Sequence, residues 1–158
     1  MKKWLKRIAL WLLILIVVGF GAGWWLMRGS LPMLEGELAL DGLSAPATIQ
    51  RDALGVVTID AANETDAMRA LGYVHAQERF FEMDLMRRVS TGELSELFGP
   101  VAIEKDKAQR VHRIRARVEA DLATMAADKR PQLQAYTDGV NAGLSALRVR
   151  PLPYLLLH

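Results

Sequence analysis

The sequence contains no cysteine among its 158 residues. This absence excludes a disulfide framework, a thiolate metal site and a cysteine nucleophile. The sequence also lacks a Gly-x-Ser-x-Gly turn, a His-Glu-x-x-His helix and a phosphate-binding glycine loop. No internal repeat or low-complexity run is present. The length predicts one domain, or one domain with an appendage.

Positive charge is scarce outside the N-terminus. The net charge is +2, but five of the 20 Lys and Arg residues lie within the first 28 positions. Without them, 15 basic residues remain against 18 acidic ones, a balance of −3. We therefore expect no nucleic-acid partner, because such a partner requires a basic face.

A long apolar segment follows the basic start. Residues 1–7 carry four Lys or Arg side chains, whereas residues 8–27 carry no charge. At about 1.5 Å per helical residue the segment spans roughly 30 Å, the hydrocarbon thickness of a bilayer. Trp4 lies near one end, and Trp24 and Trp25 near the other, where indole rings prefer the membrane interfaces. The pattern predicts a single-pass anchor in a bacterial inner membrane.

The charge bias also predicts the orientation of this anchor. Residues 1–7 form a cytoplasmic tail, and residues 31–158 face the periplasm or the cell exterior. A cleaved signal peptide is the alternative, with an apolar region at 8–18 and with Gly21 and Gly23 before the cut. No Ala-x-Ala occurs there, which favours the anchor. Either alternative exports the remainder of the chain.

The exported part begins with a linker and short strands. Residues 28–46 are interpreted as the linker, in which 36–42 alternates as a strand does. Residues 47–50 and 56–60 are rich in β-branched side chains and flank a turn-like insert. They predict two paired strands, at the start of a partial domain over 47–158.

Helices account for the rest of the chain. The first is expected to begin at Asn63 or Thr65 and to end at Gly92. Gly99-Pro100 predicts a turn, and apolar side chains at helical spacing predict a second helix over 111–125. A third helix is expected to start at 128–131 and to end at Pro151 and Pro153. The apolar residues 154–158 suggest that the sequence stops inside a larger domain.

Few side chains are candidates for chemistry. His75 lies at helical spacing from Glu78 and Glu82, but His112 is distant in the sequence, so too few ligands are present for a metal. His75 is therefore interpreted as a structural, hydrogen-bonded histidine. Three hydroxyl residues have no evident base near them: Ser90, Thr91 and Ser95. The residues themselves indicate no active site.

Charged residues are dense in two places. The first stretch predicts either helix-surface ion pairs or a buried network, since apolar residues are interleaved with it. It contains Glu78, Arg79, Glu82, Asp84, Arg87 and Arg88. The second stretch is interpreted as a solvated face. It contains Arg110, Arg113, Arg115 and Arg117.

Several segments between residues 49 and 142 together resemble the penicillin acylase (penicillin amidase) family. Residues 49–59 resemble that family's opening strand pair, and residues 66–88 its first long helix with a Gly-Tyr-Val-x-Ala-Gln core. Three further resemblances follow in family order: residues 92–99, Asp106 with Arg110, and residues 133–142. The departures are mild: Val57-Thr58 stands where Pro-His is usual, Glu78 for Asp and Glu82 for Gln.

The resemblance implies an α+β fold, as the N-terminal part of an αββα sandwich of the N-terminal-nucleophile hydrolases. In that family a precursor cleaves itself into two chains, so the expected partner is a second chain. The implied reaction hydrolyses a linear amide in an N-acylated substrate, such as penicillin or an acyl-homoserine lactone. This part would be mostly helical with a short strand pair, preceded by one transmembrane helix.

The resemblance assigns no catalytic, cofactor-binding or metal residue to positions 1–158. The family's nucleophilic serine lies on the second chain, and its calcium ligands would fall beyond His158, so the resemblance implies a calcium site only for the full-length protein and none within positions 1–158. The matched residues carry the fold instead. Gly72 and Ala76 would allow close helix packing, and a charged group would fix the helix: Arg79, Asp84, Arg87 and Arg88. A membrane-anchored, non-catalytic remnant or binding module is the alternative, if the gene ends at His158.

Overall fold

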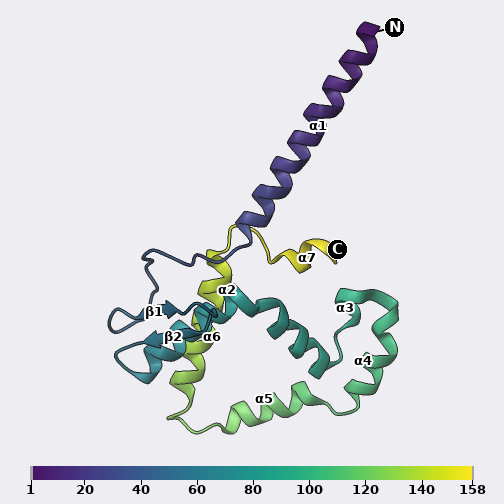
Figure 1. Ribbon diagram of the computed structural model, residues 1–158. Coiled ribbons are helices and arrows are strands. Elements are labelled where there is room, and N and C mark those ends of the chain that lie inside the picture. The colour runs from purple at the N-terminus through teal and green to yellow at the C-terminus, as the bar shows by residue number, and fades with distance from the viewer. Residues whose placement is uncertain (1, 158) are drawn as a thin grey trace.

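A computed structural model describes residues 2–157. Helix α1 (Lys2–Gly29) projects alone from a helical domain, and the remaining elements gather at its C-terminal end (Figure 1). Among residues 2–157 it is the one helix long and apolar enough to cross a membrane. A signal sequence can have the same length and composition as α1, so these two properties do not distinguish a membrane span from a signal sequence. The mostly helical character with one short strand pair is confirmed.

The strand pair forms as expected. Strands β1 (Thr48–Arg51) and β2 (Val57–Asp60) are antiparallel, with Ile49 opposite Ile59. The Asp52 side chain accepts hydrogen bonds from the backbone N–H groups of Leu54 and Val56, both at 2.8 Å, and so holds the turn.

The strand expected over residues 36–42 is wrong. This stretch is irregular, because Gly36 (φ +112°) and Gly42 (φ +86°) adopt left-handed backbone conformations at its two ends. Such conformations interrupt an extended chain.

Helix α2 (Glu64–Thr91) begins and ends where its capping residues predict. The Asn63 side chain accepts a hydrogen bond from the Asp66 N–H at 2.9 Å, and Gly92 closes the helix at φ +70°. One continuous helix is expected here, yet Arg79, next to the Glu78 that interrupts the apolar spacing, has non-helical angles (φ −136°, ψ 17°). The second half of α2 therefore points in a different direction from the first (Figure 1).

The helix expected over 111–125 forms over Ile114–Thr124, so it begins three residues later than predicted. Arg113 has a positive φ of 52°, a conformation that a right-handed helix cannot contain, so it separates the preceding helix from the following one. The Gly99-Pro100 turn is the start of a short 3₁₀ helix. The elements in this region are α3 (Ser95–Phe98), η1 (Gly99–Ala102), α4 (Ile103–Arg110) and α5 (Ile114–Thr124).

Helix α6 (Arg130–Ala146) starts at the expected position, with Pro131 in its first turn. The expected end is wrong: α6 stops at Ala146, before both prolines. Pro153 instead lies in the first turn of a further short helix, α7 (Leu152–Leu156). Proline is well placed there because a first-turn N–H has no intrahelical partner.

The core is the contact between α2 and α6, which lie side by side in Figure 1. A Cβ atom on Gly72 would lie 2.1 Å from the Tyr136 carbonyl oxygen, and one on Gly139 would lie 2.0 Å from the Arg69 carbonyl oxygen. Ala76 is completely buried beside them. The two backbones therefore touch directly, as small residues permit. The expected packing role of Gly72 and Ala76 is confirmed.

Candidate functional site at the bend of α2

The second half of α2 carries a network of charged side chains centred on Asp84. Arg88 donates from Nε to Asp84 Oδ2 at 2.8 Å, and Arg87 donates from Nη2 to Asp84 Oδ1 at 2.8 Å. The Tyr154 hydroxyl, on α7, donates to Asp84 Oδ2 at 2.7 Å. The network therefore ties two segments of the chain that are far apart in sequence.

Burial separates this network from ordinary surface ion pairs. The side chains of Asp84 and Arg88 are 10% and 15% exposed, whereas that of Arg87 is 46% exposed. Of the two readings of the charged stretch, the partly buried network is confirmed for this pair. Arg79 does not join it, since Arg79 is exposed at the kink.

The pKa values of the network follow from its contacts. Burial acts to raise the pKa of Asp84, but the hydrogen bonds from Arg88, Tyr154 and Arg87 outweigh it and hold the pKa below 3.8. Burial and the adjacent Asp84 carboxylate raise the pKa of Tyr154 above 10.0. Both groups therefore keep one protonation state near neutral pH. This suits a structural role, in which Asp84 joins α2 to α7, better than acid or base catalysis.

The segment after α2 is held by Asp106, which is 3% exposed. Its carboxylate accepts hydrogen bonds from the backbone N–H groups of Leu94 at 2.9 Å and Ser95 at 2.7 Å. Arg110 donates from Nε to the Gly92 carbonyl oxygen at 2.8 Å. The stretch 92–99 and the Asp106–Arg110 pair, separate resemblances in the sequence, are thus one structural unit.

The second arginine stretch does not behave uniformly. All four of its side chains are largely exposed, as expected. Arg110 nevertheless binds the Gly92 carbonyl, and Arg115 forms an ion pair with Glu93. The exposure of all four side chains confirms the interpretation of a solvated face, and two of them also bind neighbouring residues from it.

We expect Asp106 to contribute to the loss of the protein's stability at acidic pH. Burial acts to raise its pKa, but the hydrogen bonds from Ser95 and Leu94 hold the pKa below 3.8. Because the pKa of Asp106 is lower in the folded than in the unfolded protein, its ionised form stabilises the folded state at pH values above the unfolded-state pKa. This stabilisation is lost as the pH falls through the folded-state pKa. In urea unfolding of the full-length protein between about pH 5 and pH 2, Asp106→Asn should show a weaker pH dependence than the wild type.

The matched control for this experiment is Asp121→Asn, which removes one carboxylate from the exposed surface of α5. It should retain the wild-type pH dependence. An Asp106→Asn curve parallel to that of the wild type would contradict the assignment.

The remaining candidates have structural contacts. His75 Nδ1 lies 3.0 Å from the Tyr136 hydroxyl, which confirms a hydrogen-bonded histidine, and Glu78 pairs with Arg51. Glu82 is exposed. The Ser90 and Thr91 hydroxyls donate to backbone carbonyl oxygens one turn earlier, each at 2.9 Å. The Ser95 contribution is its backbone N–H to Asp106.

No cluster of three or more His, Asp or Glu side chains able to hold a metal occurs among residues 2–157. The described part of the chain therefore does not fit a calcium ion by itself, because calcium takes six to eight oxygen ligands in proteins.

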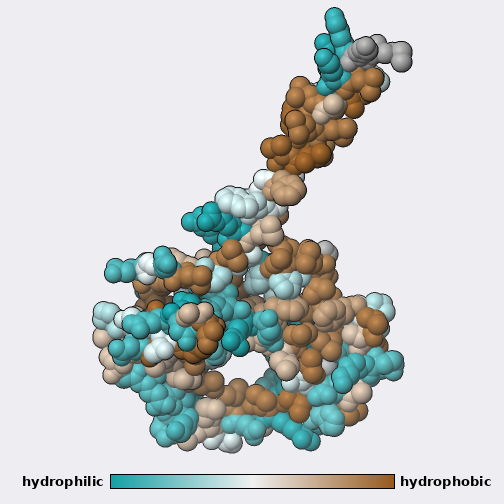
Figure 2. Space-filling view, in the orientation of Figure 1, coloured by the Kyte–Doolittle hydropathy of each residue, from teal (hydrophilic) through white to brown (hydrophobic). Residues whose placement is uncertain are grey.

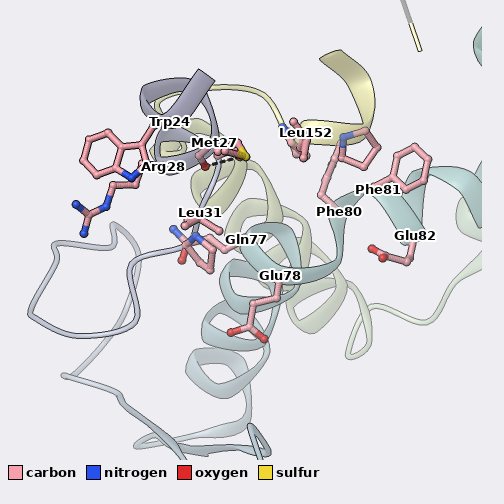
Figure 3. A pocket seen from close by; sticks show the side chains of 14 residues that line it. Trp24, Met27, Arg28, Leu31, Gln77, Glu78, Phe80, Phe81, Glu82 and Leu152 are labelled. Atoms are coloured by element: carbon pink, nitrogen blue, oxygen red, sulfur yellow. Dashed lines mark hydrogen bonds between the residues drawn. The ribbon is translucent and has the colours of Figure 1, made fainter. Parts of the chain in front are cut away.

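Two grooves flank the bend of α2. One, of about 650 Å³, lies between the foot of α1, the bend and α7; Figure 3 shows Trp24, Phe80, Phe81 and Leu152 around it. The other, of about 610 Å³, includes Tyr154 and the Asp84–Arg88 pair. The Phe81 and Tyr154 rings pack edge to face at 5.4 Å. Both grooves are mainly apolar, so this region resembles a packing surface that contains the partly buried Asp84–Arg88 ion pair.

No sequence signal identifies Tyr154 as part of the Asp84 network, because Tyr154 and Asp84 are 70 residues apart. The same holds for Asp66, which is 2% exposed and accepts a hydrogen bond from the Ser44 N–H at 3.0 Å. Its position in the first turn of α2 predicts only a favourable interaction with the helix dipole.

The penicillin amidase family model matches residues 46–158. The chain is 41% identical to penicillin acylase 2 proenzyme of Pseudomonas sp. (strain SE83) over 131 residues, which are 83% of this chain and 17% of that protein. It is 35% identical to the acyl-homoserine lactone acylase QuiP of Pseudomonas aeruginosa over 119 residues, 75% of this chain and 14% of that one. The chain thus spans about a sixth of the length of these curated relatives.

A solved structure agrees with these matches. The thermostable penicillin G acylase of Alcaligenes faecalis superposes with a TM-score of 0.59 at 29% identity, over 68% of this chain and 57% of that one. Sequence and structure point to the same relatives, and the chain belongs to the penicillin amidase family.

Proposed function

We propose that this chain is the beginning of the first chain of a self-processed amidohydrolase with an αββα sandwich. The observation that carries the proposal is the α2–α6 contact. Two of the stretches that resemble the family, 66–88 and 133–142, lie on the two helices whose backbones touch at Gly72 and Gly139. A close backbone contact tolerates few sequences, so a match at both helices is a specific signal of this scaffold.

The proposed reaction is hydrolysis of the linear amide of an N-acylated substrate, a β-lactam such as penicillin or an acyl-homoserine lactone. The names of the relatives support these two substrate classes. A serine at the N-terminus of the second chain would attack the amide with its own amino group as base, and the acyl-enzyme would then be hydrolysed. The residues described here would supply a rigid support for that second chain.

Expression of the whole gene tests the proposal. The purified protein should contain two chains, the first of which includes residues 46–158, and should release the free amine from penicillin G or from an acyl-homoserine lactone. Replacement of the residue at the N-terminus of the second chain should remove this activity. One uncleaved chain with no amine release would contradict the proposal, and a stop codon directly after His158 would favour the non-catalytic alternative.

We also propose that α1 spans the bacterial inner membrane with residues 1–7 in the cytoplasm. Residues 8–27 would form the span, 28–46 the linker and 47–158 part of the exported domain. The proposal is supported by the four basic residues before the span and by the exposed apolar surface of α1. An enzyme placed in this way would meet amides from the environment.

A reporter fused after residue 40 checks the orientation. Alkaline phosphatase should be active at this position and β-galactosidase inactive, because the position would lie outside the cytoplasm. The opposite pair of activities would overturn the orientation. N-terminal sequencing of the mature protein should give Met1, whereas a start between Gly21 and Gly29 would identify a cleaved signal peptide.

A further inference from the structure

We propose that residues 33–39 are a processing site, at which an endoprotease on the exported side of the membrane separates the domain from α1. Water adds across one peptide bond of this segment, which leaves a carboxylate on the α1 fragment and a new amino terminus on the domain. Release of the domain from the membrane rests on the proposed span of α1. The accessibility of the segment to a protease follows from its own backbone.

The segment lies between α1 and the part of the chain that matches the family. Helix α1 ends at Gly29, and the family match begins at residue 46. In Figure 1 the chain leaves the C-terminal end of α1 and runs along the outside of the domain to β1. Figure 2 shows that the apolar surface of α1 ends before the domain begins, with hydrophilic residues between them. A cut in this segment therefore leaves both α1 and the matched domain whole.

The backbone of residues 33–39 is free to bind a protease. Endoproteases take up their substrates as extended strands, which pair through backbone N–H and C=O groups. Within residues 2–157, no backbone-to-backbone hydrogen bond involves residues 33–39, and they belong to no helix or strand. All of these residues are exposed. Exposed segments with unpaired backbone groups are the preferred sites of proteolytic nicking.

The chain is fixed on both sides of the segment. Towards α1, the Gly29 carbonyl oxygen accepts a hydrogen bond from the Val149 N–H at 3.1 Å. Towards β1, the buried Asp66 carboxylate accepts hydrogen bonds from the Ser44 N–H at 3.0 Å and from the Ser44 hydroxyl. Asn63 Nδ2 donates to the same carboxylate at 2.9 Å. Such charge-assisted bonds are strong, so a cut before Ser44 leaves the N-terminal end of the domain attached to α2.

Exposure alone does not distinguish the segment from the rest of the surface. Leu54 is 89% exposed, but its turn is closed by backbone hydrogen bonds between Asp52 and Val56 at 3.1 Å and between Gly55 and Asp52 at 3.0 Å. Glu104 has an 85% exposed side chain, but it lies within α4. A protease reaches hydrogen-bonded backbone only after local unfolding. The combination of exposure and unpaired backbone groups therefore favours residues 33–39.

Limited proteolysis of the intact, full-length protein in spheroplasts, whose exported side faces the medium, tests the inference. Glutamyl endopeptidase is the probe, because the segment contains Glu35 and Glu37. The earliest cut within residues 1–158 should follow one of these two residues, so the released domain should begin at Gly36 or Leu38. Cleavage after Glu104 should be about a hundredfold slower, because α4 must open first. N-terminal sequencing and fragment masses identify the cuts.

Two matched variants check that this site is the one cleaved. Glu35→Gln with Glu37→Gln should abolish the early cut, whereas Glu104→Gln should leave its rate unchanged. The urea midpoint of the cleaved protein should equal that of the uncleaved protein, because the Ser44–Asp66 contacts follow the cut. A lower midpoint after cleavage would contradict a processing site that leaves the domain intact.

The native cells provide the second test. A soluble form of the domain that begins between Leu34 and Leu40 should accompany the membrane-bound form that begins at Met1. A population that is entirely membrane-bound would overturn the inference. A first cut of the full-length protein within residues 46–158, or a segment that resists the probe because another part of the chain covers it, would also overturn it.

The fate of the α1 fragment separates this inference from the proposals above. Retention of the fragment in the membrane after the cut supports both the processing site and the span. A soluble α1 fragment would overturn the span and release from the membrane, although the cut itself would remain. Amide hydrolysis is measured separately on the released domain, so its absence would bear on the proposed reaction and not on the site of cleavage.

Discussion

Replacing Gly139 by valine should prevent accumulation of the folded protein. A Cβ atom at this position would lie 2.0 Å from the carbonyl oxygen of Arg69 and 2.9 Å from its carbonyl carbon. Both are backbone atoms of α2, so no rotamer change relieves the clash and the two helices must separate. Overpacking a core typically costs about 1–3 kcal/mol, and we expect at least about 3 kcal/mol where backbone meets backbone.

The measurement is the amount of folded full-length protein recovered and its urea midpoint. Ser145→Val is the matched control, because it adds a β-branched side chain to an exposed position of the same helix. This variant should cost less than about 1 kcal/mol. A Gly139→Val protein with the yield and midpoint of the control would show that the α2–α6 contact is looser than the structure has it.

Asp84→Ala should also be strongly destabilising. The substitution removes the more buried carboxylate partner of Arg88, whose side chain is 15% exposed, and leaves only Glu96, whose side chain is 60% exposed. It also leaves the Tyr154 hydroxyl without its acceptor. Removing one member of a buried ion pair costs about 3–5 kcal/mol when the other charge stays desolvated and unpaired, and the remaining Glu96 pair places the expected loss at the lower end, about 3 kcal/mol. The unfolding free energy should fall by about this amount, and α7 should become accessible to proteases before the core does.

Glu104→Ala is the comparison for Asp84→Ala. Glu104 pairs with Lys107 at 2.8 Å on α4, but the two side chains are 85% and 67% exposed. Such a pair contributes less than about 1 kcal/mol. Equal losses in the two variants would refute a special role for the Asp84 network.

Local features of the fold were predictable from the sequence. Asn63 and Gly92 mark the ends of α2 through capping chemistry that involves only near neighbours in the chain. Pro131 marks the start of α6 in the same way. The paired strands follow from β-branched residues on both sides of a turn.

Features that depend on distant contacts were not predictable. Glu78 interrupts the apolar spacing next to Arg79, but a charged residue within an apolar stripe does not by itself predict a kink in α2. Arg113 is a good helix former, yet it takes a left-handed conformation between α4 and α5. Asp106 resembles any exposed acid on a short helix until the backbone of Leu94 and Ser95 folds over it. Tertiary contacts override local preference at each of these positions.

The hydrogen bond between Val149 and Gly29 has a consequence for the order of events during synthesis. Gly29 emerges from the ribosome roughly 120 residues before Val149, which takes about 6–24 s at the usual elongation rates. During that interval the C-terminal end of α1 has no domain against it. Only when Val149 has been synthesised can its N–H donate to the Gly29 carbonyl oxygen and join α1 to the end of α6, so this contact forms after the strand pair and α2 are already in place.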